Sequence, residues 1–250
     1  MKRNVQAALL LLTGSAVLHV SLLSQVYLRY VKEGLRPFLV VSAVLLLVLG
    51  VTGAVRDGLP FAPRHPDREE TDDGHGHGHG GGPRVAWMLF LPVLALLLYA
   101  PPALGSYTAG RETDDAVARV EEFGPLPTGD PVPLALSAFI ARVQQDRARG
   151  LTSRTVLLTG FVTPAKDRPG AWHLTRLVVS CCAADSRSLR VLVHGAPAPP
   201  ADTWVTVTGT WRPAGGPPAT GPAPVAVDAR TVERVPEPVN PYQDTTPRPR

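Results

Sequence analysis

Three long apolar runs occupy the first part of the chain, at residues 5–26, 37–55 and 85–105, and none of them contains Asp, Glu, Lys or Arg. A run of about 20 apolar residues is long enough to cross a bilayer as an α-helix. The surface helices of soluble proteins, by contrast, keep a polar face. The pattern therefore predicts a transmembrane region over residues 1–105 with three membrane-spanning helices.

The first apolar run has a second interpretation. It follows Lys2 and Arg3, as the apolar core of a secretory signal peptide follows a basic start, but it is longer than such a core usually is. We therefore interpret residues 5–26 as a membrane anchor, and a cleaved signal peptide is the alternative.

From residue 106 onward the chain is polar. Residues 106–133 are rich in turn-forming residues, which is typical of a linker. Apolar side chains then recur at helical spacing from 136 to 143, ahead of Gly150, and this pattern predicts a short amphipathic helix. Five short segments with apolar and β-branched residues follow, at 155–162, 171–179, 189–195, 203–211 and 225–235.

Five strands of this length suit a small, partly open barrel, of which the OB-fold is the commonest design. Gly160 and Gly209 fit bends in such strands. The expected fold is an α+β membrane protein with three N-terminal transmembrane helices and a small extramembrane OB-like β-barrel domain that a short helix precedes. This domain covers residues 134–235, and a tail covers 236–250.

Composition and charge narrow the function classes. The chain has 250 residues and a formal net charge of +4, and its arginines are spread along its length. This distribution indicates no nucleic-acid-binding face. Lysine and arginine residues beside the apolar runs slightly favour a cytoplasmic N-terminus. With three spans, this topology gives a multi-pass protein of the cell membrane whose C-terminal domain lies outside the cytoplasm.

The loop between the second and third runs, residues 56–84, contains a histidine-rich tract. His75, His77 and His79 alternate with glycines. Neutral imidazoles on a flexible backbone bind borderline metals such as Zn²⁺, Cu²⁺ or Ni²⁺, and this composition cannot bury a core. We expect transient metal binding here, and a solvated low-complexity linker is the alternative.

His19 lies inside the first apolar run. An ionisable residue at membrane depth is costly and usually faces a partner or a cavity. The sequence leaves open whether His19 is functional or is a neutral histidine bonded to a neighbouring helix.

Both cysteines of the chain are adjacent, where the second predicted strand ends. Cys181 and Cys182 precede Asp185 by a few residues. Consecutive Cα atoms lie about 3.8 Å apart, whereas disulfides usually need at least about 4.4 Å, so a disulfide between them is disfavoured. The thiolates and the carboxylate are suitable ligands for Zn²⁺ or another soft metal ion, and His173 and His194 on flanking strands are candidates for further ligands.

Two other interpretations of the thiols stay open. A free cysteine also packs as a small buried hydrophobic residue, and an exposed thiolate can exchange disulfides, although no C-x-x-C motif is present. The chain has no Gly-rich phosphate loop, H-E-x-x-H or G-x-S-x-G motif. We therefore expect no enzymatic turnover.

Several of these features together resemble one family. Three apolar runs, a His/Asp/Gly loop, "LTGFV", "LTRLVVSCCAADS" and a closing "NPY" are similar to the YcgQ-like bacterial membrane proteins. The resemblance implies a subunit of a two-component permease, with a separate multi-span permease as its partner. It also implies that Cys182 and Asp185 dominate the site and that Cys181 assists, because the family sometimes has His at the position of Cys181.

The resulting hypothesis is a membrane accessory protein that handles a soft metal or metalloid through Cys182 and Asp185 for a partner permease. A structural docking subunit with buried thiols is one alternative. A thiol-dependent redox protein is another.

Overall fold

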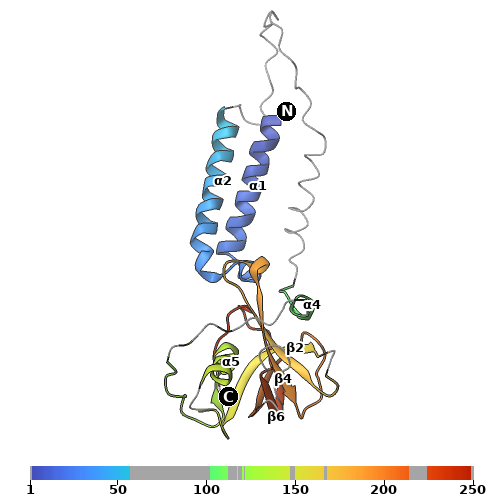
Figure 1. Ribbon diagram of the computed structural model, residues 1–250. Helices are drawn as coiled ribbons and strands as arrows, with labels where there is room; N and C mark the ends of the chain where they lie inside the picture. The colour runs from blue at the N-terminus through green and yellow to red at the C-terminus, as the bar shows by residue number, and fades with distance from the viewer. Residues whose placement is uncertain are drawn as a thin grey trace, which may run out of the picture. The chain divides into compact units, whose positions relative to one another are not determined.

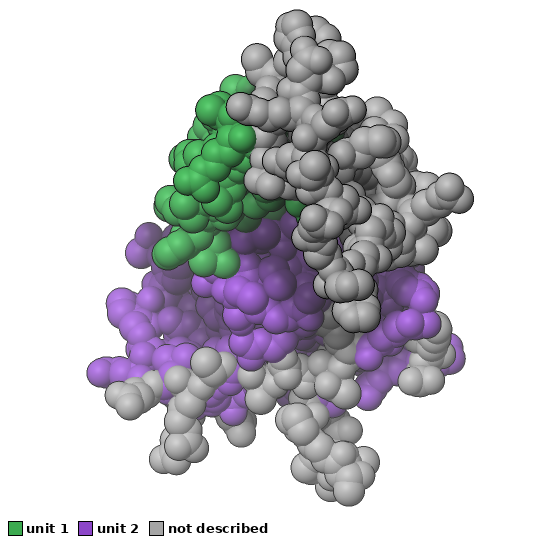
Figure 2. All heavy atoms as spheres, turned by 90° about the horizontal axis from the view of Figure 1, so that it is seen from above, with its two compact units in different colours: residues 1–27, 33–102 green, residues 28–32, 103–250 purple. Residues whose placement is uncertain are grey.

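The computed structural model describes residues 2–56, 102–111, 117, 120, 122–146, 150–165, 168–213 and 224–248. The chain forms two compact units, which Figure 2 colours separately. The first unit comprises Met1–Tyr27 and Glu33–Pro102, and the second comprises Leu28–Lys32 and Ala103–Arg250. The second unit thus includes a short segment from the N-terminal part of the chain.

The described part of the first unit consists mainly of two helices, α1 (Lys2–Leu22) and α2 (Arg36–Arg56), which lie side by side (Figure 1). They pack through small residues. A Cβ atom on Gly14 would lie 2.9 Å from Cγ of Leu47, and one on Gly50 would lie 2.8 Å from Cγ of Leu11. Close approach through glycine and alanine is typical of helix pairs in membranes.

Among the described residues, one segment, Glu33–Arg56, is long and apolar enough to cross a membrane, with a mean hydropathy of 2.7. A signal sequence or the core helix of a soluble protein would meet the same criteria of length and composition. The expectation of three spans is therefore not met in the described part of the chain. The apolar stretch of α1, Gln6–Leu22, is shorter than a span. Residues 85–101 of the third run lie outside the described residues.

Helix α1 ends before residue 26 because Ser24 bonds back to the last turn. Its hydroxyl donates to the carbonyl oxygen of Val20 at 2.9 Å and accepts the N–H of Val26 at 3.4 Å. Two 3₁₀ turns follow, η1 (Val26–Arg29) and η2 (Glu33–Leu35). His19 consequently lies in the last turn of α1, not in the middle of a span, and it is exposed.

The second unit contains a six-stranded sheet, and the helix α5 precedes its five longer strands. Its elements are α4 (Ser106–Ala109), β1 (Val132–Pro133), α5 (Leu136–Gln145), β2 (Thr155–Pro164), β3 (Trp172–Val178), η4 (Ala183–Asp185), β4 (Arg187–His194), β5 (Trp204–Arg212) and β6 (Ala226–Arg234). The short helix and the five predicted strands are confirmed, with bounds that shift by a few residues. The sequence did not predict β1, α4 or η4.

The sheet has the order β1-β2-β3-β4-β6-β5, and β2 also pairs with β5. The five strands β2, β3, β4, β6 and β5 therefore form a closed ring of paired strands. Neighbours are antiparallel except for the parallel pairs β1–β2 and β4–β6. The register of β5 against β6 shifts at Thr208/Gly209. At Gly160, a Cβ atom would lie 2.6 Å from the carbonyl oxygen of Thr175, so β3 approaches β2 there as only glycine permits.

The main hydrophobic core lies between α5 and the strands. Phe139 of α5, Leu158, Leu174, Val191 and Val207 are fully buried in it. The amphipathic pattern of α5 places its apolar side chains on this core and its polar side chains outward.

The segments on either side of the predicted domain also belong to it. Val132, in the predicted linker, is completely buried. Tyr242, in the predicted tail, is 5% exposed in a second apolar cluster with Phe161 and Trp204, and its hydroxyl accepts the N–H of Leu104 at 2.8 Å. The β domain therefore extends beyond residue 235, because the C-terminal segment supplies part of its packing.

Candidate functional site

The adjacent cysteines lie in a tight turn between β3 and β4. Asp185 is the acceptor that organises this turn. Its carboxylate accepts backbone N–H groups of Ser180 at 3.0 Å, Cys181 at 2.8 Å and Cys182 at 3.4 Å. The three-residue spacing predicted the proximity of the thiols to Asp185, and the structure shows that the carboxylate is already engaged by the backbone.

The electrostatics of the turn keep the exposed thiol protonated. The Cys181 thiol donates a hydrogen bond to Asp185, and this bond, with a second to Cys182, raises the pKa of Cys181 to about 11. The same thiol and the backbone N–H groups lower the pKa of Asp185. Thiolate is the nucleophile and the metal ligand, so Cys181 is not an activated cysteine at neutral pH.

Both thiols are free, and neither is in the hydrophobic core. Cys181 is exposed and Cys182 is half-buried. The interpretation of the pair as core residues therefore does not fit Cys181. A reagent or an ion can reach Cys181 from solvent, provided that it displaces the proton.

The cysteine turn also has a backbone partner. Val31 and Cys182 form an antiparallel bridge. The N–H of Lys32 donates to the carbonyl oxygen of Cys181 at 3.0 Å, and the N–H of Ala183 donates to that of Tyr30 at 2.7 Å. These bonds build the segment between η1 and η2 into the second unit. They give the turn a structural role that the sequence did not indicate.

The structure does not bring the predicted histidine ligands to the cysteines. His173 pairs with Leu192 near the start of β3, and His194 ends β4. The cysteine turn joins the other ends of these strands, and the five steps from His173 to Val178 alone span roughly 17 Å. The expectation that His173 and His194 are ligands at the Cys182 site is therefore wrong. Both histidines lie on the two strands that the cysteine turn joins, but at the opposite end of these strands.

Over the described part of the chain, no group of three or more His, Cys, Asp or Glu side chains is placed to hold a metal ion. Cys181, Cys182 and Asp185 of the turn are therefore not arranged as such a group. His75, His77 and His79 lie outside the described residues.

A buried arginine forms a second polar centre, which the sequence analysis missed. Arg176 of β3 is 2% exposed, and its Nε donates to the carbonyl oxygen of Thr159 at 3.2 Å. Its guanidinium lies over the ring of Trp204, 5.0 Å from the centroid. Burial lowers the pKa of Arg176, and the charge of Asp244 opposes this shift. By the alternation of side chains along a strand, Arg176 lies on the same face of β3 as Trp172 and Leu174. A charged residue at a position where the pattern predicts a buried apolar side chain could have indicated this polar centre.

Asp244, from the C-terminal segment, is the buried acid next to this arginine. Its Oδ1 lies 3.7 Å from Nε of Arg176. The carboxylate also accepts the N–H groups of Leu136 at 3.0 Å and Ser137 at 2.7 Å, in the first turn of α5. One side chain thus connects the C-terminal segment, a helix N-terminus and a strand.

Comparison with known protein families matches residues 142–243 to the DUF1980 C-terminal domain. This is a domain family of unknown function. The matched region begins within α5, contains the cysteine turn and Arg176, and includes Tyr242 from the segment predicted as a tail. No curated protein and no solved structure matches the chain.

Proposed function

We propose that the protein is a membrane-anchored accessory subunit without catalytic turnover, whose β domain binds a partner membrane protein. The observation that carries this proposal is the exposure of the apolar helix in Glu33–Arg56, because only 11% of its 18-residue apolar window is buried within the protein. Phe38, Leu45 and Val55 of α2 are 70%, 57% and 71% exposed. A bilayer, or further helices within one, supplies the apolar surroundings that such a helix needs.

The packing of α1 against α2 supports a membrane location. Ala7 and Ala43 are buried between them, and Gly14 and Gly50 allow close contact. Small residues at a helix interface matter most where lipid removes the hydrophobic drive for association. In this proposal the β domain lies outside the cytoplasm.

The order of strand pairing supports an OB-like barrel. Strands β2, β3, β4, β6 and β5 pair in sequence and return to β2, with β4 and β6 parallel. OB-like domains commonly present a binding surface on a small closed sheet. Because folds of this kind host unrelated functions, the partner is proposed from the resemblance to permease subunits and not from the fold.

The anchoring part of the proposal is tested by carbonate extraction of membranes from cells that express the full chain. We expect the wild-type protein to stay in the pellet. The double variant Leu45→Arg/Leu49→Arg places two charges at the middle of α2, each costing about 3 kcal/mol at bilayer depth, and should be lost from the pellet. Phe38→Arg/Val55→Arg is the matched control, because long side chains near the helix ends reach the interface.

The mass of the mature chain separates an anchor from a signal peptide. An intact N-terminus in the membrane pellet supports the proposal. A chain shortened near residue 26, or wild-type protein released by carbonate, contradicts it.

The partner is tested by co-expressing the tagged chain with a multi-span permease of the kind that the resemblance implies. We expect the two to co-elute in mild detergent, whereas an unrelated multi-span protein at the same level should not. Separate elution of the two proteins, both intact, together with no cross-link in membranes, would remove the permease partner from the proposal.

A soft metal or metalloid carrier is the second candidate function. The favouring observation is that two adjacent free thiols, one exposed, lie beside Asp185. Arsenite and Zn²⁺ titrations of the full chain in detergent test it. Binding should disappear in Cys181→Ser and Cys182→Ser and persist in His194→Ala. Binding that survives both serine variants, or no binding by the wild-type protein, would reject this function.

A further inference from the structure

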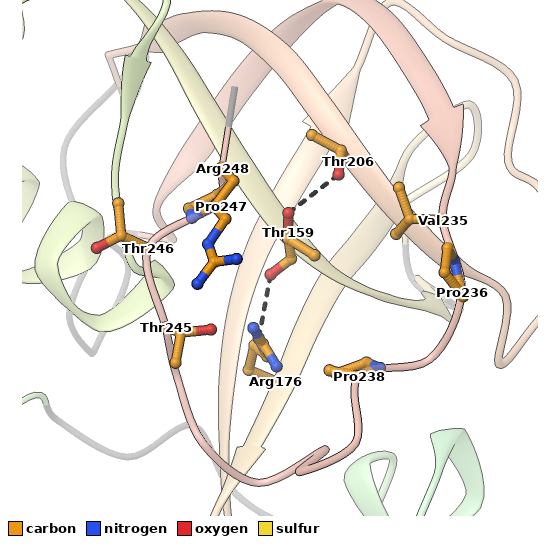
Figure 3. Close-up of a pocket in the computed structure, with 10 residues that line it drawn as sticks. All are labelled: Thr159, Arg176, Thr206, Val235, Pro236, Pro238, Thr245, Thr246, Pro247 and Arg248. Carbon is orange, nitrogen blue, oxygen red and sulfur yellow. Dashed lines mark hydrogen bonds between the residues drawn. The ribbon is translucent and has the colours of Figure 1, made fainter. Parts of the chain in front are cut away.

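A cavity of about 420 Å³ lies in the second unit, between strands β2, β3 and β5 and the C-terminal segment (Figure 3). Its size is within the range of pockets that take small organic ligands. Arg176 lines it from β3, and Arg248 lines it from the C-terminal segment. Figure 3 shows the Arg248 side chain directed from that segment toward Thr159 and Arg176.

Arg176, which lines this cavity, carries a buried donor that is unsatisfied. Its Nη1 atom is buried and has no hydrogen-bond partner among the described residues, although Nε is bonded to Thr159. A buried polar group without a partner costs about 1 to 3 kcal/mol, and more when the group is charged. An arginine that lines a cavity and retains a free donor is suited to an anionic oxygen.

The charges around the cavity set the charge of the ligand. Arg176 and Arg248 are cations, and Asp244 lies 3.7 Å from Arg176 and offsets one of them. A net charge of +1 then remains. A monoanion neutralises this charge, whereas a dianion would leave the site with a net negative charge. Thr245 and Thr246 also line the cavity, and Figure 3 shows the Thr245 hydroxyl on the side of Arg176, where it can donate a hydrogen bond.

Apart from Thr159 and Thr206, whose hydroxyls hydrogen-bond to each other, the remaining wall is apolar. Val235, Pro236, Pro238 and Pro247 line the cavity around its polar centre. Rigid prolines and a valine offer a surface for a hydrocarbon or aromatic group, without polar atoms that such a group would leave unpaired. The wall thus distinguishes an organic anion from a fully hydrated inorganic one.

We propose that this cavity binds a small organic monocarboxylate, with its carboxylate at Arg176 and Arg248 and its apolar part against the proline wall. The site is separate from the cysteine turn and does not depend on membrane anchoring or on the permease partner. Residues 245–248 of the C-terminal segment form one side of the site. A bound ligand therefore contacts both this segment and the strands, and holds the two together.

Calorimetric titration of benzoate into the full chain in nonionic detergent, at low ionic strength, tests the proposal. We expect saturable binding with a Kd below about 1 mM. Benzyl alcohol has the same ring without the charge and should not bind detectably. Inorganic phosphate should bind at least tenfold more weakly than benzoate.

Three arginine variants assign the binding to this cavity. Arg248→Gln should weaken benzoate binding about tenfold, and Arg176→Met should abolish it. Arg230→Gln is the control, because it removes an exposed positive charge of β6 outside the cavity and should change the Kd less than twofold. Circular dichroism shows whether Arg176→Met is folded. If it is not, the comparison of Arg248→Gln with Arg230→Gln decides alone.

Several results would overturn the proposal. They are no saturable heat with benzoate up to about 10 mM, equal binding of benzyl alcohol, phosphate binding as tight as that of benzoate, or an unchanged Kd in Arg248→Gln. Each of these would show that the two arginines do not form a carboxylate site.

Discussion

Nε of Arg176 lies 3.7 Å from Oδ1 of Asp244, and the two side chains are 2% and 7% exposed. The pair joins β3 to a segment that follows the last strand, and Asp244 also bonds the first turn of α5. Removing one partner of a buried ion pair leaves the other charge desolvated, which costs more than the pair itself contributes.

Asp244→Ala should therefore destabilise the β domain strongly. We expect a loss of about 3 kcal/mol in the free energy of unfolding, measured by urea denaturation of the full chain in detergent. Asp228→Ala is the matched control. Its partner Arg212 is 2.6 Å away, but the side chains of Arg212 and Asp228 are 49% and 48% exposed, so the loss should stay below about 1 kcal/mol. Equal effects of the two variants would contradict the structural role of Asp244.

The hydrogen bond between Cys181 and Asp185 should make an exposed cysteine slow to react. Because the pKa of Cys181 is raised to about 11, little thiolate is present at pH 8. In Cys182→Ser, iodoacetamide should modify Cys181 roughly tenfold or more slowly than a free thiol, since the rate follows the thiolate fraction. Adding Asp185→Asn should shift the midpoint of the pH–rate profile downward. A profile midpoint near 8.5 without that substitution would show that the bond is absent.

The turn should also contribute to stability in a defined pH window. Asp185 has a lowered pKa in the folded state, so its contribution is present above its unfolded pKa of about 3.9 and is lost as pH falls through the folded value. Cys181 has the opposite sign. Its contribution is present below the unfolded thiol pKa, about 8.5, and is lost as pH rises through about 11.

Urea midpoints of wild type and Asp185→Asn across pH measure this linkage. The difference between the two proteins should be constant near neutral pH and should shrink below about pH 4 and, progressively, above about pH 8.5. A difference that does not depend on pH would mean that Asp185 acts only through neutral contacts.

The strands were predictable because local alternation determines them. Segment 203–211 alternates valine and threonine, and the structure places Val205 and Val207 in the core with Thr206 half-buried. The spacing of Cys182 and Asp185 likewise fixed their proximity, because a three-residue separation within a turn leaves little freedom. These features depend on neighbours in sequence.

The rest depends on contacts that sequence spacing does not reveal. Tyr242 and Asp244 are in a Pro-rich polar segment that resembles a tail, yet their partners Leu104 and Leu136 are 138 and 108 residues away. Similarly, only the register of the β3–β4 hairpin shows at which end of these strands His173 and His194 lie. The histidines were therefore assigned to the wrong end of the hairpin.

The close approach of β3 to β2 at Gly160 gives a final prediction. In Gly160→Ala, the new Cβ would lie 2.6 Å from the carbonyl oxygen of Thr175 and 3.1 Å from Cγ of Leu174. A backbone atom cannot move aside as a flexible side chain does, so the strands must separate, at a cost of about 2 kcal/mol. Gly124→Ala is the control, because a Cβ atom on Gly124 would meet no other atom within 4 Å, and the stability should change by less than about 0.5 kcal/mol. Urea denaturation measures both variants, and a Gly160→Ala protein as stable as Gly124→Ala would contradict the observed strand spacing.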